Sequence, residues 1–211
     1  MPTPPSRPYH HGKLKQALID MAVTVAEETG KDLISVREVA RRLGVSSGAP
    51  FRHFPNRESL MTAVAEEALM RLRLRVERDL LDAPPAPIDR LKTLGRSFIQ
   101  WALHNPTQFK LLSSRRLFEF DRSASLPVHF DAVRQITLDL VAQAQKAGDL
   151  PPGPLPEFAL ALRALAYGLA RMHVDGQLPQ WQVDITQAEA TLIASMNLIV
   201  EGLRPARPRP S

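Results

Sequence analysis

Cysteine is absent from this sequence of 211 residues. Its absence excludes disulfide bonds, thiolate zinc sites, iron–sulfur clusters and a cysteine nucleophile. A long apolar run is also missing, because Arg163 and Arg171 interrupt the most hydrophobic region, 158–172, which excludes a membrane-spanning helix there. Four prolines within residues 1–8 stand where a signal peptide needs an apolar stretch. We therefore expect a soluble protein located in the cytoplasm.

Segments that alternate apolar and polar residues, as strands do, are missing as well. Instead, 19 prolines separate segments in which apolar residues recur every three or four positions, as on one face of a helix. Two of these segments cover residues 14–25 and 185–203. The pattern predicts an all-α protein with about nine helices. With 44% hydrophobic and 23% charged residues, a chain of this length can bury a core without cross-links.

A helix–turn–helix is predicted over residues 35–54. Ser35 and Glu38 have the spacing of a capping box at the start of a first helix, and Gly44 suits the left-handed conformation that ends one. Ser46 is then placed to cap a second helix. The outer side of that second helix carries small or polar residues, so its backbone can approach a DNA groove closely. The same spacing also fits an αα-corner in any helical protein.

Positive charge favours one of these two interpretations. The net charge of the chain is +5, and residues 37–57 alone hold five arginines and one glutamate. The preceding segment adds Arg7, Lys13 and Lys15 with no acidic residue between them. Cations that neutralise phosphates release the counterions condensed on duplex DNA. A basic cluster on a helix–turn–helix therefore favours DNA binding over a purely structural corner.

Three stretches of this region resemble the DNA-binding domain of TetR-family transcriptional regulators. They are YHHGKL at 9–14, SVREVARRLGVSSGAPFRHF at 35–54 and RESL at 57–60. The resemblance covers residues 9–72. It implies a three-helix DNA-binding domain, a linking fourth helix, and a helical C-terminal domain that binds a small molecule and dimerises.

On this plan we expect the following organisation. The DNA-binding domain spans residues 12–72, and the C-terminal ligand-binding and dimerisation domain spans 73–203. Disordered tails are expected at 1–8 and 204–211, because both are rich in proline and arginine. A helix over about 57–81 is the expected link between the two domains.

Two positions depart from the family pattern. Family members usually carry an aliphatic residue and a tyrosine where this chain has Pro50 and Phe51. A proline is tolerated in the first turn of a helix. Phe51 lacks the hydroxyl that relatives commonly use on a phosphate, so one backbone contact should be missing. Its ring can still pack against a thymine methyl.

The DNA contacts are expected from the helix–turn–helix and the basic arm before it. Arg52, or a neighbour such as Ser47, should contact base edges, while Lys13, Arg37 and Arg57 should contact phosphates. The full set of candidates is Tyr9, His10, Lys13, Ser35, Arg37, Ser46, Ser47, Gly48, Ala49, Phe51, Arg52, His53 and Arg57.

The C-terminal part carries a second resemblance. HNPTQFKLL at 104–112 and the pair Tyr167-Gly168 are similar to the C-terminal domain of one subgroup of the family, whose signature ends in a tryptophan, a histidine and a glycine. Arg163 and Tyr167 occupy the positions where that tryptophan and histidine are expected. The resemblance implies no particular ligand.

Aromatic residues are few, at 6% of the chain, and nine of the twelve lie beyond residue 97. Some of them are expected to line an apolar ligand cavity with a few polar anchors. The candidates are Trp101, Phe109, Phe130 and Arg171. A filled core would account for the same residues.

Dimerisation is expected through the last two long helices. Alanines and a glycine make the helix within 159–170 small-sided, and the stripe 185–203 supplies an apolar face, so two copies of each helix can form a four-helix bundle. The candidate interface residues are Ala161, Gly168, Leu192, Met196 and Ile199.

The sequence therefore predicts a homodimeric, ligand-responsive transcriptional regulator that represses from a palindromic operator. It contains no recognisable catalytic motif, metal-ligand cluster or phosphate-binding loop, so we expect no enzyme activity, metal or cofactor. Two alternatives stay open: a small helical enzyme with its pocket in the C-terminal domain, and a non-specific architectural DNA binder. The latter would bind random and selected DNA equally well.

Overall fold

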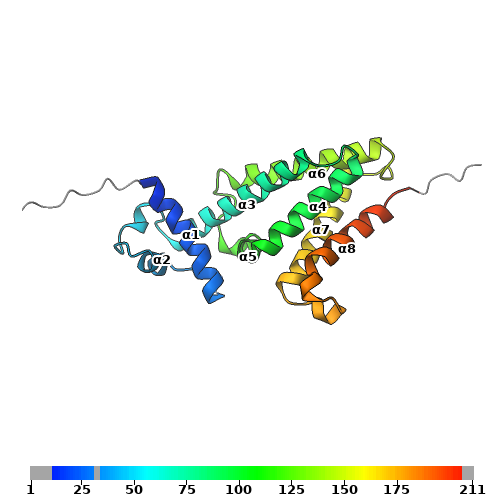
Figure 1. Ribbon diagram of the computed structural model, residues 1–211. Helices are drawn as coiled ribbons and strands as arrows, with labels where there is room; N and C mark the ends of the chain where they lie inside the picture. The colour runs from blue at the N-terminus through cyan, green and yellow to red at the C-terminus, as the bar shows by residue number, and fades with distance from the viewer. Residues whose placement is uncertain (1–10, 31–33, 206–211) are drawn as a thin grey trace, which may run out of the picture.

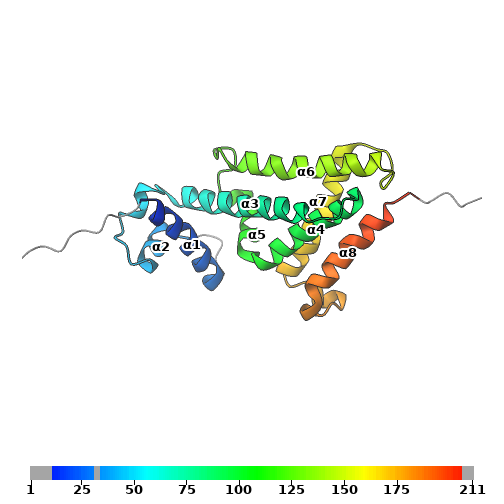
Figure 2. The same cartoon turned by 45° about the horizontal axis from the view of Figure 1, so that its top comes forward.

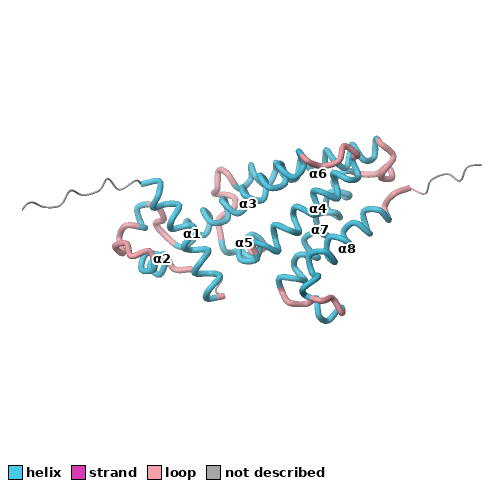
Figure 3. Tube along the Cα trace, viewed as in Figure 1, coloured by secondary structure: helices cyan, strands magenta, loops and turns pink. Residues whose placement is uncertain are grey.

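The computed structural model describes residues 11–30 and 34–205. Over these residues the regular secondary structure is entirely helical, with eight α-helices and four short 3-10 helices (η), which confirms the all-α class (Figure 3). None of these helices is long and apolar enough to cross a bilayer. In chain order they are α1 (His11–Thr29), α2 (Val36–Arg42), η1 (Pro50–Arg52), α3 (Arg57–Leu81), α4 (Pro87–His104), α5 (Pro106–Leu112), η2 (Arg115–Leu117), α6 (Leu126–Lys146), α7 (Leu155–Val174), η3 (Leu178–Trp181), η4 (Ile185–Gln187) and α8 (Ala188–Gly202).

The helices form two regions that share α3. Helices α1 and α2 lie at one end of the molecule, and α4 to α8 form the larger region beyond them (Figure 1). Helix α3 packs against α1 near its start and then runs beside α6 and α4, as two views of the fold show (Figure 1; Figure 2). It therefore connects the two regions as one continuous helix.

The apolar periods of α1 and α2 build the core of the first region. Leu18 and Val39 are fully buried there, together with Phe54 from the loop before α3 and Leu60 from the first turn of α3. Burial of a leucine or phenylalanine side chain stabilises a fold by about 1.5–3 kcal/mol. This cluster holds the short helices in a fixed arrangement on α3.

The start of α3 is fixed by a capping box. The Asn56 side-chain oxygen accepts a hydrogen bond from the Ser59 N–H at 2.7 Å, and the Ser59 hydroxyl accepts one from the Asn56 N–H at 3.3 Å. Each bond satisfies a backbone donor that a helix start would otherwise leave unpaired. From this cap α3 continues for 25 residues, over the range 57–81 expected for the linking helix.

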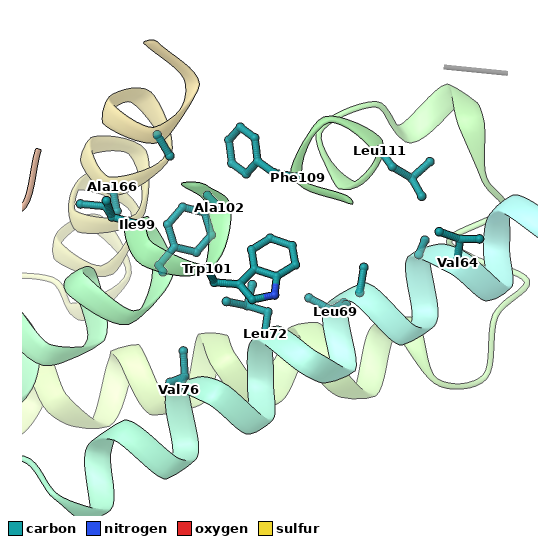
Figure 4. Packing of buried hydrophobic residues seen from close by; sticks show 14 of the residues in the cluster. Val64, Leu69, Leu72, Val76, Ile99, Trp101, Ala102, Phe109, Leu111 and Ala166 are labelled. Atoms are coloured by element: carbon teal, nitrogen blue, oxygen red, sulfur yellow. The ribbon is translucent and has the colours of Figure 1, made fainter. Parts of the chain in front are cut away.

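The core of the larger region lies where α3, α4, α5 and α7 meet. Figure 4 shows the indole of Trp101, on α4, directed toward Leu72 of α3, with the ring of Phe109 approaching from α5. Trp101 and Phe109 are both buried. Two aromatic residues of the C-terminal part are thus buried beside α3.

Gly95 allows α8 to pack closely on α4. A Cβ at this position would lie 2.8 Å from the Cε of Met196, closer than carbon atoms pack. Met196 and Leu192 are both buried within the protomer. We therefore assign them to the core, which corrects their prediction as dimer-interface residues. The apolar period of α8 was the correct signal for a buried face, but the helix that covers this face is α4 of the same chain.

The end of α8 is followed by an ordered contact. Arg204, which was expected in a disordered tail, donates a hydrogen bond to the Asp149 carboxylate at 2.7 Å. The described chain is therefore packed up to this residue. The expected tail at 1–8, and the part of the other tail from 206 onward, lie outside the described residues.

Candidate DNA-binding face and ligand cavity

Helix α2 is the first helix of the predicted motif. Its start differs from the sequence prediction, whereas its end agrees with it. Ser35 is at the N-cap position, but its side chain makes no capping hydrogen bond. The predicted capping box is absent, because the Glu38 carboxylate accepts hydrogen bonds from Arg41 and Arg42 instead. Gly44 has a φ of +66° and ends the helix, as predicted.

The second helix of the motif is one 3-10 turn, η1, rather than an α-helix. Pro50 lacks the N–H that would donate to the Ser46 carbonyl in an α-helix. That carbonyl accepts a hydrogen bond from the Ala49 N–H instead, at 3.1 Å, and the His53 N–H donates to the Pro50 carbonyl at 2.9 Å. No side chain caps η1, so the predicted cap by Ser46 is also absent. The proline substitution thus shortens the segment that would face DNA.

The residues of this turn share one open face. Nothing lies within 4 Å of the position that a Cβ would occupy on Gly48, so the backbone is accessible there. Ala49 and His53 are half-buried at its edge. Within residues 46–53, the exposed residues among the predicted contacts are Ser46, Ser47, Gly48, Phe51 and Arg52.

Two of the arginines in the basic cluster are neutralised within the motif. Glu38 pairs with Arg41 at 2.7 Å and with Arg42 at 3.0 Å, and Arg42 also pairs with Glu28. Hydrogen bonds, first from Arg41 and then from Arg42, lower the pKa of Glu38 from 4.5 to about 2. The carboxylate is therefore charged at neutral pH, and much of the local positive charge is cancelled.

Three of the cations predicted to contact DNA are free to bind an external anion. Lys13, Arg37 and Arg52 are exposed, and none has an acidic partner within the described residues. Arg57 is also exposed but pairs with Glu58 at 2.8 Å. Ser35 is exposed at the start of α2, two residues before Arg37.

Two candidates for DNA contact cannot be placed. Tyr9 and His10 lie outside the described residues.

A cavity of about 260 Å³ lies in the larger region, bounded by α3, α4, α6, α7 and the segment after α5. An adjoining hollow of about 240 Å³, between α6 and α7, shares several of its walls. Three of the four predicted pocket residues, Trp101, Phe109 and Phe130, line the cavity. The lining is mostly apolar and aromatic, as is usual for sites that bind small organic molecules.

Arg171, the fourth predicted pocket residue, is not part of this wall. Its guanidinium pairs with Asp175, one turn further along α7, at 2.6 Å. Arg163 lines the cavity instead. Eight residues separate the two arginines, which places them about 80° apart around the helix. Both interrupt the same apolar stretch of sequence, and only the packing of α7 decides which one faces inward.

Two regions of the chain match known protein families. Residues 18–64 match the family described as "Bacterial regulatory proteins, tetR family", and residues 91–196 match "Tetracyclin repressor-like, C-terminal domain". The chain belongs to the TetR family. It is therefore a DNA-binding transcriptional regulator. Because TetR proteins are regulators and not enzymes, the alternative of a small helical enzyme is set aside.

Individual relatives agree with this assignment. The chain is 25% identical over 155 residues to the HTH-type transcriptional repressor KstR2 of Mycolicibacterium smegmatis, covering 70% of this chain and 73% of KstR2. It is 27% identical over 122 residues to the nucleoid occlusion factor SlmA of Aliivibrio fischeri, covering 57% of this chain and 60% of SlmA.

Solved structures share the fold over most of the chain. A protein of unknown function from Rhodococcus sp. RHA1 superposes with a TM-score of 0.79 at 28% identity, covering 95% of this chain and all of that one. The ketosteroid transcriptional regulator KstR2 of Mycobacterium tuberculosis superposes with a TM-score of 0.65 at 18% identity, covering 95% and 98% of the two chains.

On this TetR-family chain, α7 and α8 leave apolar side chains uncovered. Leu160 and Leu198 are 70% and 72% exposed, and Ile199 is 47% exposed. Ala161 is exposed next to Leu160, and Gly168 has open space where a Cβ would stand. Three of the predicted interface residues, Ala161, Gly168 and Ile199, are thus accessible, in contrast to the two that are buried.

Proposed function

We propose that this protein represses transcription by binding a palindromic operator as a homodimer, and that a small molecule in the cavity releases it. One observation carries the proposal: α3, a single helix of 25 residues, connects two features. At one end lies the exposed face with the unpaired cations Lys13, Arg37 and Arg52, and further along lies the aromatic cavity. The name of the relative KstR2, a transcriptional repressor, supports repression rather than activation. The proposed domain boundary, between 72 and 73, then falls within α3.

The proposed DNA contacts divide into two kinds. Arg52, with Ser47 beside it, contacts base edges, while Lys13, Arg37 and Arg57 contact phosphates. Because η1 is one turn long and flanked by small residues, it has to enter the major groove as a compact turn, with the backbone near Gly48 close to the bases. The Arg57–Glu58 pair has to open or be shared, so Arg57 contributes less than Arg37.

The proposed dimer forms through α7 and α8. Their exposed apolar residues, among them Leu160, Leu198 and Ile199, would be buried in a bundle of two helices from each chain. A helix–turn–helix dimer contacts two half-sites about one helical turn of DNA apart, so the protein symmetry predicts a palindromic operator.

The proposed coupling between ligand and DNA starts from the segment after α5. The Glu119 N–H donates to the Thr62 hydroxyl at 3.0 Å, and the Ser123 hydroxyl donates to the Glu66 carboxylate at 2.6 Å. This segment, residues 113–125, lines part of the cavity and is thereby tied to the half of α3 nearest the DNA-binding face. A ligand that shifts it would tilt that face and change the spacing of the two recognition turns.

The experiment that tests the proposal is selection of bound fragments from the host genome, followed by affinity measurements on the best fragment and on random DNA. A repressor of this kind binds the selected palindrome about 10³-fold or more tightly than random DNA at physiological salt. Equal affinity for both would favour the architectural DNA binder instead. Transcription from a promoter carrying the palindrome then distinguishes repression from activation.

A further inference from the structure

Arg163 is a cation surrounded by aromatic rings. Its guanidinium carbon lies 4.2 Å from the centre of the Phe98 ring and 5.5 Å from that of Tyr167. No carboxylate within the described residues pairs with it, and the surrounding protein lowers its pKa by desolvation. The residue is exposed, and it lines both the cavity and the adjoining hollow.

Arg115, from η2, is a second unpaired cation in the wall of the same cavity. Its guanidinium carbon lies 3.4 Å from the centre of the Phe120 ring and 5.8 Å from that of Phe130. It too has no acidic partner within the described part of the chain. Two helices that are distant in sequence thus each direct one arginine toward the same space.

The wall contains no opposing charge. Among the described residues that line the cavity and the adjoining hollow, none is an aspartate or a glutamate. Two other arginines of the same region do have acidic partners: Arg75 pairs with Asp79 at 2.5 Å, and Arg134, at the rim of the adjoining hollow, pairs with Asp131 at 3.2 Å. An arginine held against aromatic rings loses part of its hydration without gaining a counter-ion, so a ligand that supplies a negative charge would be stabilised there.

We propose that the effector is an organic carboxylate with a flat ring system, whose carboxylate binds Arg163 and whose rings lie against Phe98, Trp101 and Phe109. The proposal rests on the proposed function, because it names the chemical class of the ligand in that cavity. A guanidinium presents two parallel N–H donors that match the two oxygens of a carboxylate. Arg115 adds attraction at the mouth formed by the 113–125 segment, which is tied to α3.

A matched pair of probes tests the charge requirement directly. The full-length protein is titrated by calorimetry, without DNA, with 2-naphthylacetic acid and with its uncharged, nearly isosteric amide. We expect the acid to bind about 10- to 100-fold more tightly than the amide, the range expected for a hydrogen-bonded charge pair. Equal affinities, or no binding of the acid at up to about 1 mM, would overturn the proposal.

Variants then locate the charge. Arg163→Gln keeps a hydrogen-bond donor but removes the charge, so the preference for the acid should disappear while the amide binds as before. The control is Arg134→Gln, which changes an arginine of the adjoining hollow that is already paired with Asp131, and it should keep the full preference. A preference for the acid that persists in Arg163→Gln would contradict the assignment. The comparison of acid and amide on the unaltered protein stands even if a variant fails to fold.

Failure of this inference is distinguishable from failure of the proposed function. Operator affinity is measured in a separate experiment, with and without each compound. If the acid binds through Arg163 but leaves operator affinity unchanged, the ligand class holds and the release mechanism is wrong. If only uncharged compounds bind the cavity and release the operator, the mechanism holds and the carboxylate class is wrong.

Discussion

The two regions joined by α3 hold unpaired arginines in opposite surroundings. At the DNA-binding face, Arg37 and Arg52 are exposed to solvent, where water and salt screen their charge. In the cavity, Arg163 lies against aromatic rings, where few competing dipoles surround it. The exposed pair suits attraction to a dense line of phosphates that varies with salt. Arg163, held against aromatic rings in the cavity wall, suits selection of one chemical group at short range.

The two regions also differ in whether acidic residues pair with their arginines. Near the DNA-binding face, Glu38 pairs with both Arg41 and Arg42, and Glu28 is a second partner of Arg42, so two carboxylates set how many cations remain available. The wall of the cavity has no such carboxylate among its described residues. A single substitution of an acidic residue can therefore change the net charge of the DNA-binding face. In the cavity, only a bound ligand can supply a negative charge to the arginines.

The largest expected effect comes from dissociating the proposed dimer into monomers while leaving each protomer folded. Leu198→Asp places a charge on the exposed side of α8 and should yield folded monomers. Because two linked half-sites bind about 10²- to 10⁴-fold more tightly than one, operator affinity should fall by at least about 100-fold. Binding of 2-naphthylacetic acid in the cavity should be unchanged, since Leu198 is 72% exposed and remote from the cavity wall. Sedimentation, operator titration and calorimetry measure the three quantities.

Met196→Asp is the matched variant on the buried side of α8. It places a charge against Gly95 in the core, so it should unfold the protein rather than dissociate it. A folded monomer from Met196→Asp, or an intact dimer from Leu198→Asp, would show that the two faces of α8 are assigned the wrong way round.

The next effect concerns sequence preference at the DNA-binding face. Arg52→Ala removes the proposed base contact and should cost about 1–3 kcal/mol in each half-site, with relaxed preference at one base pair. The matched control is Arg41→Ala, because Arg41 is held by Glu38 at 2.7 Å. It should change operator affinity little. Binding to a library of operator variants measures both quantities, and unchanged preference in Arg52→Ala would move the base contacts to α2 or the N-terminal arm.

A smaller and uniform effect is expected from a phosphate contact. Arg37→Gln should weaken binding to all sequences alike and reduce the salt dependence of binding by about one counterion per protomer. Affinities for operator and random DNA at several salt concentrations give this slope. A change in preference without a change in slope would make Arg37 a base contact instead.

Much of the architecture could be predicted from the sequence, because its signals are local. Proline positions and apolar periods marked the helices, and residues 57–81 were expected as a single helix. The shortened recognition turn was not foreseen, although its cause is local too: Pro50 removes a backbone donor, and its neighbours adopt 3-10 hydrogen bonds. Whether the loss of one backbone N–H shortens a helix depends on how the rest of the turn packs.

The packing partners of buried faces are harder to predict from the sequence. The apolar spacing of a helix shows which of its faces is buried but not which element covers that face. Leu192 and Met196 have the same apolar spacing whether α4 or a second chain covers them, and only the packing of α8 on α4, about 100 residues away in sequence, shows that they are buried within the protomer. Arg163 and Arg171 looked equivalent in sequence. Their separation by eight residues places them about 80° apart, which still allows one broad helix face, so only the packing of α7 shows that Arg163 lines the cavity.

The surroundings of Arg163 predict a modest gain in stability when its charge is removed. Arg163→Met keeps much of the side-chain volume and ends the partial desolvation of an unpaired guanidinium, so the free energy of unfolding should rise by at most about 1 kcal/mol, because the side chain is partly exposed and solvent screens its charge. Arg37→Met, at an exposed site, should change it by less than about 0.5 kcal/mol. Urea denaturation measures both. A loss of stability in Arg163→Met would show that the contacts with Phe98 and Tyr167 outweigh the desolvation.

The smallest effect concerns the pH dependence of the Glu38 cluster. The pKa of Glu38 in the folded state, about 2, lies below its ordinary value of 4.5, so the unfolded chain binds more protons between these two pH values. Stability contributed by Glu38 is therefore complete above about pH 4.5 and is lost as the pH falls toward 2. Glu38→Gln should lower the melting temperature slightly at pH 7, and the difference from the unaltered protein should shrink over that window. The same variant releases Arg41 and leaves Arg42 paired with Glu28 alone, so it should bind random DNA more tightly and with a steeper salt dependence. A difference in melting temperature that is constant from pH 7 to pH 2.5, together with unchanged DNA binding, would mean that Glu38 does not limit the charge of this face.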